Sequence, residues 1–203
     1  MLLHPQAHNG FNMPSPIGHT LAGICGFYLA YPQISKTQRI AALLTAIFVA
    51  NSPDLDIFAG LILHQDPSIL HRQATHSFIV ALFIGCVIAM ISRILKFKHW
   101  SWIGVWFAGL YASHILLDLL VADDALPYGL QGFWPITISY YISPITIFNG
   151  FDYSEPGLTM LQSMMTFNNL IGVSKEIVIL IPLVWFSWNF AMKFNKNNYS
   201  NPI

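Results

Sequence analysis

The chain has 203 residues, of which 55% are hydrophobic and only 9% are charged, and its mean hydropathy is +0.55. Soluble domains usually carry about a quarter charged residues, so this composition is typical of a membrane protein. Nine basic residues balance nine acidic ones, which argues against the positive surface that nucleic-acid binding requires. The length suits one domain, and we expect residues 1–203 to form a single membrane-embedded unit.

Five apolar segments predict an all-α, multi-pass membrane helical bundle. They are residues 17–31, 40–63, 77–95, 100–121 and 176–192. The first follows Pro14 and Pro16, and its fifteen residues make about 22 Å of helix, which is short for the roughly 30 Å hydrocarbon core. The second contains Pro53 and is either one helix interrupted by a polar turn or a helix followed by a re-entrant segment. Residues 122–174 are mixed in character, and we expect them to form an extramembrane or interfacial insert.

Basic side chains fall in alternate connections between the apolar segments. The three clusters are Lys36 with Arg39, Arg93 with Lys96 and Lys98, and Lys193 with Lys196. The positive-inside rule puts these connections on the cytoplasmic side of a bacterial inner membrane. The N-terminus, residues 51–76 and residues 122–175 are then expected on the outer side.

Histidines and aspartates gather in four short motifs. They are His19 in PIGHT, Asp54 and Asp56 in SPDLD, His71 and His76 in HRQATHS, and His114 and Asp118 in SHILLDLL. The last pair is four residues apart, which is about one helical turn, so both side chains share a helix face. All four motifs lie where the predicted topology places the outer side. Imidazole and carboxylate are ligands of zinc, manganese and iron, so the motifs predict a metal site at the outer end of the bundle.

Each motif alone also has a simpler interpretation. His114 and Asp118 can pair with each other, and Asp54 and Asp56 can cap a helix or form a turn. Taken together, however, buried charges need partners, and these His and Asp residues exceed the four ligands of a structural zinc site. We therefore expect an open site or a two-metal site. The expected direct ligands are His19, Asp56, His76, His114 and Asp118, which Asp54 and His71 either join or orient.

Three residues are candidates for catalytic roles at such a site. A metal-activated water would attack an ester, and Asp54 or His71 could accept its proton. Arg72 could hold a phosphate oxygen, although an arginine at the membrane interface is an equally good interpretation.

The order of these motifs, with YGLQGFWP after them, resembles the YdjM-like family of membrane-bound metal-dependent hydrolases over residues 15 to about 135. The positions that the family uses for its metal site match His19, Asp54 or Asp56, His71, Thr75, His76, His114 and Asp118. The order is also similar, more distantly, to that of zinc-dependent phospholipase C and related single-strand nucleases. That pattern continues with further histidines and a glutamate, whereas this chain has no histidine after His114. Four later residues are candidates to substitute: Asp123, Asp124, Glu155 and Glu176.

The resemblance implies a membrane-bound hydrolase that cleaves a phosphoester, for example in a lipid head group, or another ester of a membrane-associated substrate. It also implies one or two divalent ions, zinc in the first place and manganese or iron as alternatives. The rival hypothesis is a non-catalytic membrane protein that uses the cluster for structural metal binding, metal transport or partner interaction. The lipid bilayer is the expected partner, no nucleic acid is expected, and the sequence does not determine the oligomeric state.

Overall fold

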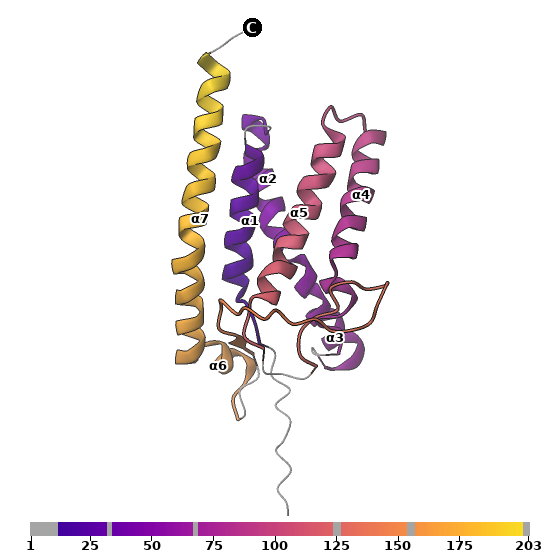
Figure 1. Ribbon diagram of the computed structural model, residues 1–203, viewed down its shortest axis with the longest axis vertical. Helices are drawn as coiled ribbons and strands as arrows, with labels where there is room; N and C mark the ends of the chain where they lie inside the picture. The colour runs from indigo at the N-terminus through magenta and orange to yellow at the C-terminus, as the bar shows by residue number, and fades with distance from the viewer. Residues whose placement is uncertain (1–11, 32–33, 67–68, 124–126, 154–156, 201–203) are drawn as a thin grey trace, which may run out of the picture.

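A computed structural model describes residues 12–31, 34–66, 69–123, 127–153 and 157–200, and most of them are helical. Five helices run side by side along the long axis (Figure 1), and they are α1 (Pro16–Ala30), α2 (Arg39–Asn51), α4 (Phe78–Ile94), α5 (Trp100–Leu119) and α7 (Phe167–Ser200). The described residues form one small antiparallel sheet, in which β1 (Asn12–Met13) pairs with β2 (Phe151–Asp152). The prediction of an all-α membrane fold is thus confirmed.

Serine side chains begin two of the long helices. Ser15 caps α1, where Pro16 occupies the first helical position and the Ser15 hydroxyl accepts a hydrogen bond from the amide of Gly18. Ser77 caps α4 in the same way, accepting from the amide of Ile79 at 3.1 Å. These caps fix the points at which the chain enters both helices.

The second apolar segment is one helical stretch with an interruption, which is the first of the two predicted alternatives. After α2 the chain forms a short 3-10 turn, η3 (Ser52–Asp54), and then continues into α3 (Leu55–His64). Pro53 lies within this turn. It interrupts the α-helix because proline cannot donate the backbone hydrogen bond that a continuous helix needs. The interruption brings two aspartates, Asp54 and Asp56, to the end of the bundle.

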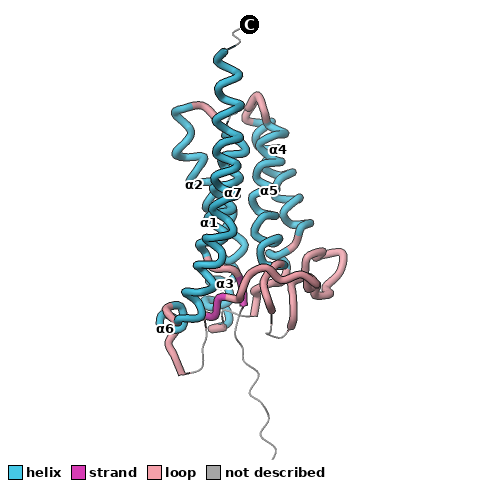
Figure 2. The backbone as a smooth tube through the Cα atoms, turned by 60° about the vertical axis from the view of Figure 1, so that its left-hand side comes forward, coloured by secondary structure: helices cyan, strands magenta, loops and turns pink. Residues whose placement is uncertain are grey.

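Helix α5 is the centre of the bundle. It contacts α1, α2 and α4, and α7 packs on the other side of α1 (Figures 1 and 2). The buried core between these helices includes Phe27, Ala46, Ala81, Leu110 and Ile115. A second, smaller core joins the end of α5 to α7 through Leu117 and Leu180.

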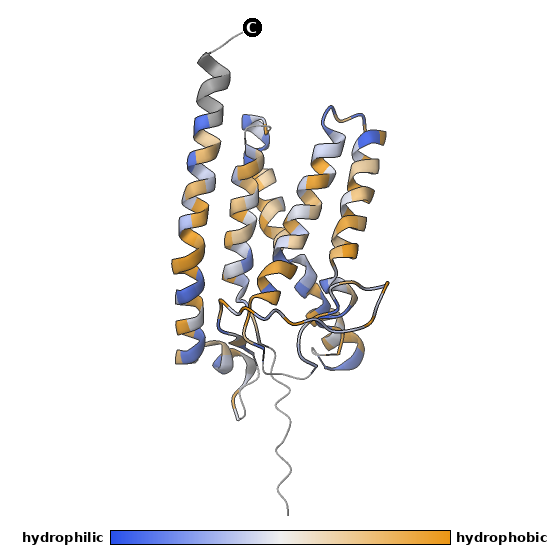
Figure 3. Ribbon diagram, in the orientation of Figure 1, coloured by the Kyte–Doolittle hydropathy of each residue, from blue (hydrophilic) through white to orange (hydrophobic). Residues whose placement is uncertain are grey.

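The outward faces of the helices are apolar. Figure 3 shows hydrophobic residues along the middle of each long helix and hydrophilic residues gathered toward helix ends and connections. Three described stretches are long and apolar enough to cross a membrane, and they are Lys36–His64, Trp100–Leu119 and Phe167–Lys193. Helix α4 is apolar but shorter, at 17 residues, and α1 has the expected 15.

The two ends of the bundle differ in their connections. The α1–α2 connection, the α4–α5 connection and the C-terminal end of α7 all lie at the same end (Figure 1), and these parts carry the predicted basic clusters. Helix α3 and residues 127–153 lie at the opposite end.

Helix α7 begins earlier than the last apolar segment, at Phe167, and a short helix, α6 (Met160–Met164), precedes it. Hydropathy misses the first turns because they contain polar residues such as Asn169. The Asn169 amide is buried, where it donates to the carbonyls of Asp152 and Ser163, so these turns are held by specific hydrogen bonds.

Candidate metal centre

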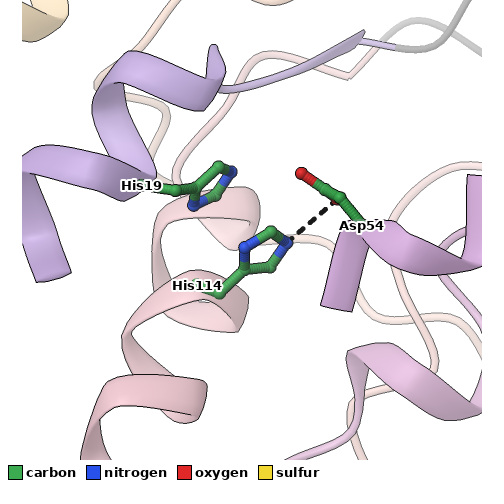
Figure 4. Close-up of side chains that lie close together, drawn as sticks. All are labelled: His19, Asp54 and His114. Carbon is green, nitrogen blue, oxygen red and sulfur yellow. Dashed lines mark ion pairs between the residues drawn. The ribbon is translucent and has the colours of Figure 1, made fainter. Parts of the chain in front are cut away.

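The seven predicted metal ligands come together at one end of the bundle. His19 lies in the first turn of α1, Asp54 is the last residue of η3, and Asp56 lies in the first turn of α3. A short 3-10 turn, η4 (Ala74–His76), ends with His76, and His71 lies in the loop before it. His114 and Asp118 lie in the last two turns of α5. Figure 4 shows three of them from separate elements, with His114 paired to Asp54 and His19 beside it. Every one of these side chains except that of Asp54 is at most 3% exposed.

Four donor atoms form an inner quartet: Nε2 of His76, Nε2 of His114, Oδ1 of Asp54 and Oδ2 of Asp118. The two imidazole nitrogens are 3.3 Å apart, and each lies between 3.1 and 3.5 Å from both carboxylate oxygens. Donors at roughly 2.0–2.2 Å from a tetrahedral zinc ion lie about 3.3–3.6 Å from one another. The distances that involve the two imidazole nitrogens are therefore close to those at a tetrahedral ion.

Neighbouring groups fix the histidine tautomers that a metal would need. The Nδ1 of His114 lies 2.8 Å from the carbonyl oxygen of Ala50, so Nδ1 carries the proton and donates it. The Nδ1 of His76 lies 3.2 Å from Oδ2 of Asp56 and faces that carboxylate. In both rings Nε2 then faces the quartet and would bind a metal in place of a proton, as in the carboxylate–histidine–metal arrangement of known metal sites.

Asp56 lies outside the quartet and contacts the histidines from behind. Its Oδ1 is 3.0 Å from Nδ1 of His71, and its Oδ2 accepts a hydrogen bond from the hydroxyl of Thr75. The geometry thus favours Asp54 as the direct ligand and Asp56 as the orienting residue, the reverse of the preference drawn from the sequence. Positions 54 and 56 flank the start of a helix, where residues two apart point to different sides, and spacing alone does not say which side faces the ligands.

The charge state of His76 follows from these contacts. Burial disfavours the imidazolium form, but contacts with the carboxylates of Asp118, Asp54 and Asp56 outweigh burial and raise the pKa of His76 well above its ordinary value. The site therefore demands a positive charge at its centre, and a divalent ion would supply the same compensation.

His19 adds a further donor beside the quartet. Its ring stacks on that of His114, with the centroids 3.7 Å apart, and its Nε2 lies 3.4 Å from Oδ1 of Asp118. Within the described part of the chain, neither ring nitrogen of His19 and neither oxygen of Asp118 makes a hydrogen bond. Buried polar atoms without hydrogen bonds are costly, and a cation between them would remove that cost, so these residues fit a metal ion.

Asp54 is the most exposed member of the cluster, with a side chain that is 16% exposed, although its Oδ1 is buried. Arg72 is placed near this end, but its guanidinium forms an ion pair with Asp123, and its backbone carbonyl accepts from the amide of Gln131. Asp123 also accepts from the amide of Gly129, so Arg72 anchors the loop that follows α5. The prediction that Arg72 binds phosphate stays a prediction.

Two residues near the cluster had no specific partner predicted from the sequence. The carboxylate of Glu176, on α7, accepts hydrogen bonds from the amide and the hydroxyl of Ser15, at the N-terminus of α1. Tyr153 is half-buried, which raises its pKa, and the negative charges of Asp54, Glu176 and Asp118 add to that rise. Glu176 was a candidate substitute ligand but contacts Ser15 instead, and two other candidates, Asp124 and Glu155, lie outside the described residues.

The apolar helices and the buried cluster define a helical membrane protein with a His and Asp site that could hold a metal ion. The chain belongs to the YdjM inner membrane protein family, which it matches over residues 13–197. The predicted resemblance to this family is thus confirmed, whereas the similarity to phospholipase C stays a prediction. No solved structure matches the chain significantly.

Proposed function

We propose that this protein is a metal-dependent hydrolase of the inner membrane that cleaves a phosphoester, or another ester, of a membrane-associated substrate. The observation that carries the proposal is the inner quartet, in which each of two buried imidazole nitrogens lies 3.1–3.5 Å from both carboxylate oxygens. With His and Asp donors and no thiolate among them, zinc is the first choice and manganese or iron are alternatives.

The donors of the quartet suit hydrolysis. A divalent ion held there would supply an activated water near neutral pH and would neutralise the charge that develops on a phosphoester. His76, His114, Asp54 and Asp118 would hold that ion, and Asp54, whose side chain is 16% exposed, would be the ligand nearest the surface.

His71 and Asp56 form a pair suited to proton transfer. The Nδ1 of His71 faces Oδ1 of Asp56 at 3.0 Å, so Asp56 would keep the Nδ1 proton and leave the other ring nitrogen as the acceptor. His71 also lies close to two members of the quartet, since its donor atom and those of Asp54 and His76 are within 4.8 Å of one another. We assign the role of proton acceptor to His71, with Asp54 as the alternative.

The position of the basic clusters supports an outward-facing site. They lie in connections at the end of the bundle opposite α3 (Figure 1), and the positive-inside rule assigns such connections to the cytoplasm. The site would then face the outer side of the membrane, near the level of lipid head groups. A phosphate-bearing lipid or lipid-linked molecule is therefore the class of substrate that we propose.

One observation favours a second function, a structural metal site. Four protein donors complete the shell of a tetrahedral ion, as structural zinc sites do. Metal transport has less support, because α4 has no acidic or basic residue before Arg93, in its last turn.

Hydrolysis can be tested on protein purified in detergent, loaded with zinc and assayed with a chromogenic phosphodiester and with phospholipids in mixed micelles. We expect cleavage that chelation abolishes and zinc restores, and its loss in His114→Ala. The matched control is His99→Ala, which removes an exposed histidine in the α4–α5 connection at the opposite end of the bundle. Bound zinc without turnover, or turnover that His114→Ala does not change, would contradict the hydrolase and favour the structural site.

A further inference from the structure

The cluster contains more donors than one ion can use, and they are arranged in two groups. We propose that the site holds two divalent ions, with the carboxylate of Asp118 bridging them and His19 as a ligand of the second ion. This inference rests on the metal site of the proposed function and adds the number of ions and their ligands.

The two oxygens of Asp118 face different histidines. Oδ2 lies 3.1 Å from Nε2 of His76 and 3.3 Å from Nε2 of His114, within the quartet. Oδ1 lies 3.4 Å from Nε2 of His19, outside the quartet. When the two oxygens of a carboxylate face separate sets of imidazoles, each oxygen can bind a different ion. The carboxylate is then placed to bridge two ions.

The stacking of His19 on His114 provides the spacing between the ions. The rings are 3.7 Å apart and inclined by only 16°, and Figure 4 shows both directed toward Asp54. Two parallel imidazoles that point the same way hold their ions side by side at about the ring spacing. Paired ions in two-metal hydrolases lie about 3.5–4 Å apart, which matches this spacing.

Asp54 lies within reach of both positions. Its carboxylate belongs to the quartet, and its donor atom also lies within 4.8 Å of those of His19 and His114. The second ion would therefore have His19, Asp118 and Asp54 as ligands. Fewer protein ligands than the first ion has would leave coordination positions for water or substrate, and the second ion should be released more easily.

Charge also favours two ions. The cluster contains three carboxylates, those of Asp54, Asp56 and Asp118, while Arg72 is paired with Asp123 outside it. With neutral histidines, one divalent ion leaves a net charge of 2 − 3 = −1, and two ions give 4 − 3 = +1. Only the second state attracts an anionic phosphoester.

The experiment measures zinc per chain by elemental analysis after equilibration with buffered zinc, in the wild type, His19→Gln and the control His99→Ala. We expect two zinc ions in the wild type and in the control, and loss of one in His19→Gln. One zinc per saturated wild-type chain, or two that His19→Gln leaves in place, would overturn the inference.

Electron paramagnetic resonance of the wild type loaded with Mn²⁺ provides a second readout that needs no variant to fold. Two ions that share a carboxylate give an exchange-coupled spectrum, and we expect to observe it. The six-line spectrum of isolated Mn²⁺ at saturation would overturn the inference. Turnover with one ion per chain would contradict the two-ion site but not the proposed hydrolase activity. Two ions per chain without turnover would contradict the hydrolase activity but not the two-ion site.

Discussion

The different positions of Asp54 and Asp56 lead to a direct test of the metal centre. Asp54 contributes Oδ1 to the inner quartet, whereas Asp56 contacts His71, His76 and Thr75 from outside it. The substitutions Asp54→Asn and Asp56→Asn keep side-chain size and remove one negative charge each. They serve as controls for each other.

The magnitude for Asp56→Asn follows from its contacts. The amide replaces one acceptor oxygen by an N–H₂ group, which cannot accept from Thr75 or from Nδ1 of His76 and favours the wrong His76 tautomer. Loss of an outer partner of a metal-bound histidine typically weakens metal affinity about 10–100-fold, or about 1.4–2.7 kcal/mol. We expect that loss for Asp56→Asn, and a larger one for Asp54→Asn because a direct ligand is removed.

The assay is a competition titration of zinc against a chromophoric chelator of known affinity, with detergent-purified protein. Both variants should remain helical by circular dichroism, because neither residue belongs to the apolar core. A greater loss of affinity in Asp56→Asn than in Asp54→Asn would refute the assignment of the inner ligand. Equal affinities in the wild type and both variants would refute the metal centre.

Packing, anchoring and topology give three more predictions. Gly104→Ala should destabilise the α4–α5 pair by about 1–3 kcal/mol, because an added Cβ would lie 2.5 Å from a backbone oxygen of α4, whereas Gly109→Ala, with no atom within 4 Å, should be neutral or slightly stabilising in thermal unfolding. Glu176→Gln should lower stability by about 1–3 kcal/mol, since two charge-assisted hydrogen bonds to α1 weaken, and an unchanged melting temperature would contradict this. In a cysteine-free background, an impermeant thiol reagent should label Tyr128→Cys in intact cells and Lys98→Cys only after permeabilisation, and the opposite pattern would reverse the topology.

The convergence of the site could be predicted from the sequence because it depends on topology. His19, His76 and His114 lie at those ends of apolar segments that alternate connections bring to one side. Hydropathy and chain order are enough to determine this, and the four-residue spacing to Asp118 identifies the helix face that carries the last pair.

The finer arrangement could not be predicted because it depends on contacts between distant residues. The Ala50 carbonyl that fixes the His114 tautomer is a backbone group 64 residues away, and no side-chain pattern reveals it. Glu176 and Ser15 are 161 residues apart, and no short-range sequence pattern links them. The pairing of Arg72 with Asp123 likewise depends on how the loop after α5 folds back.

The strongest argument between a structural and a catalytic metal lies in what surrounds the quartet. A structural zinc site needs four donors and a closed shell, and the quartet would satisfy it without His19 or His71. A closed structural site gives no reason to bury those two further imidazoles against the same carboxylates, since each buried polar ring costs free energy unless it is satisfied. The side chain of Asp54 is also 16% exposed, although the Oδ1 that faces the histidines is buried, so one edge of the site reaches the surface. Extra donors and an edge near the surface are both expected at a site that binds a second ion and a substrate. The catalytic interpretation therefore explains features that a structural site would not need.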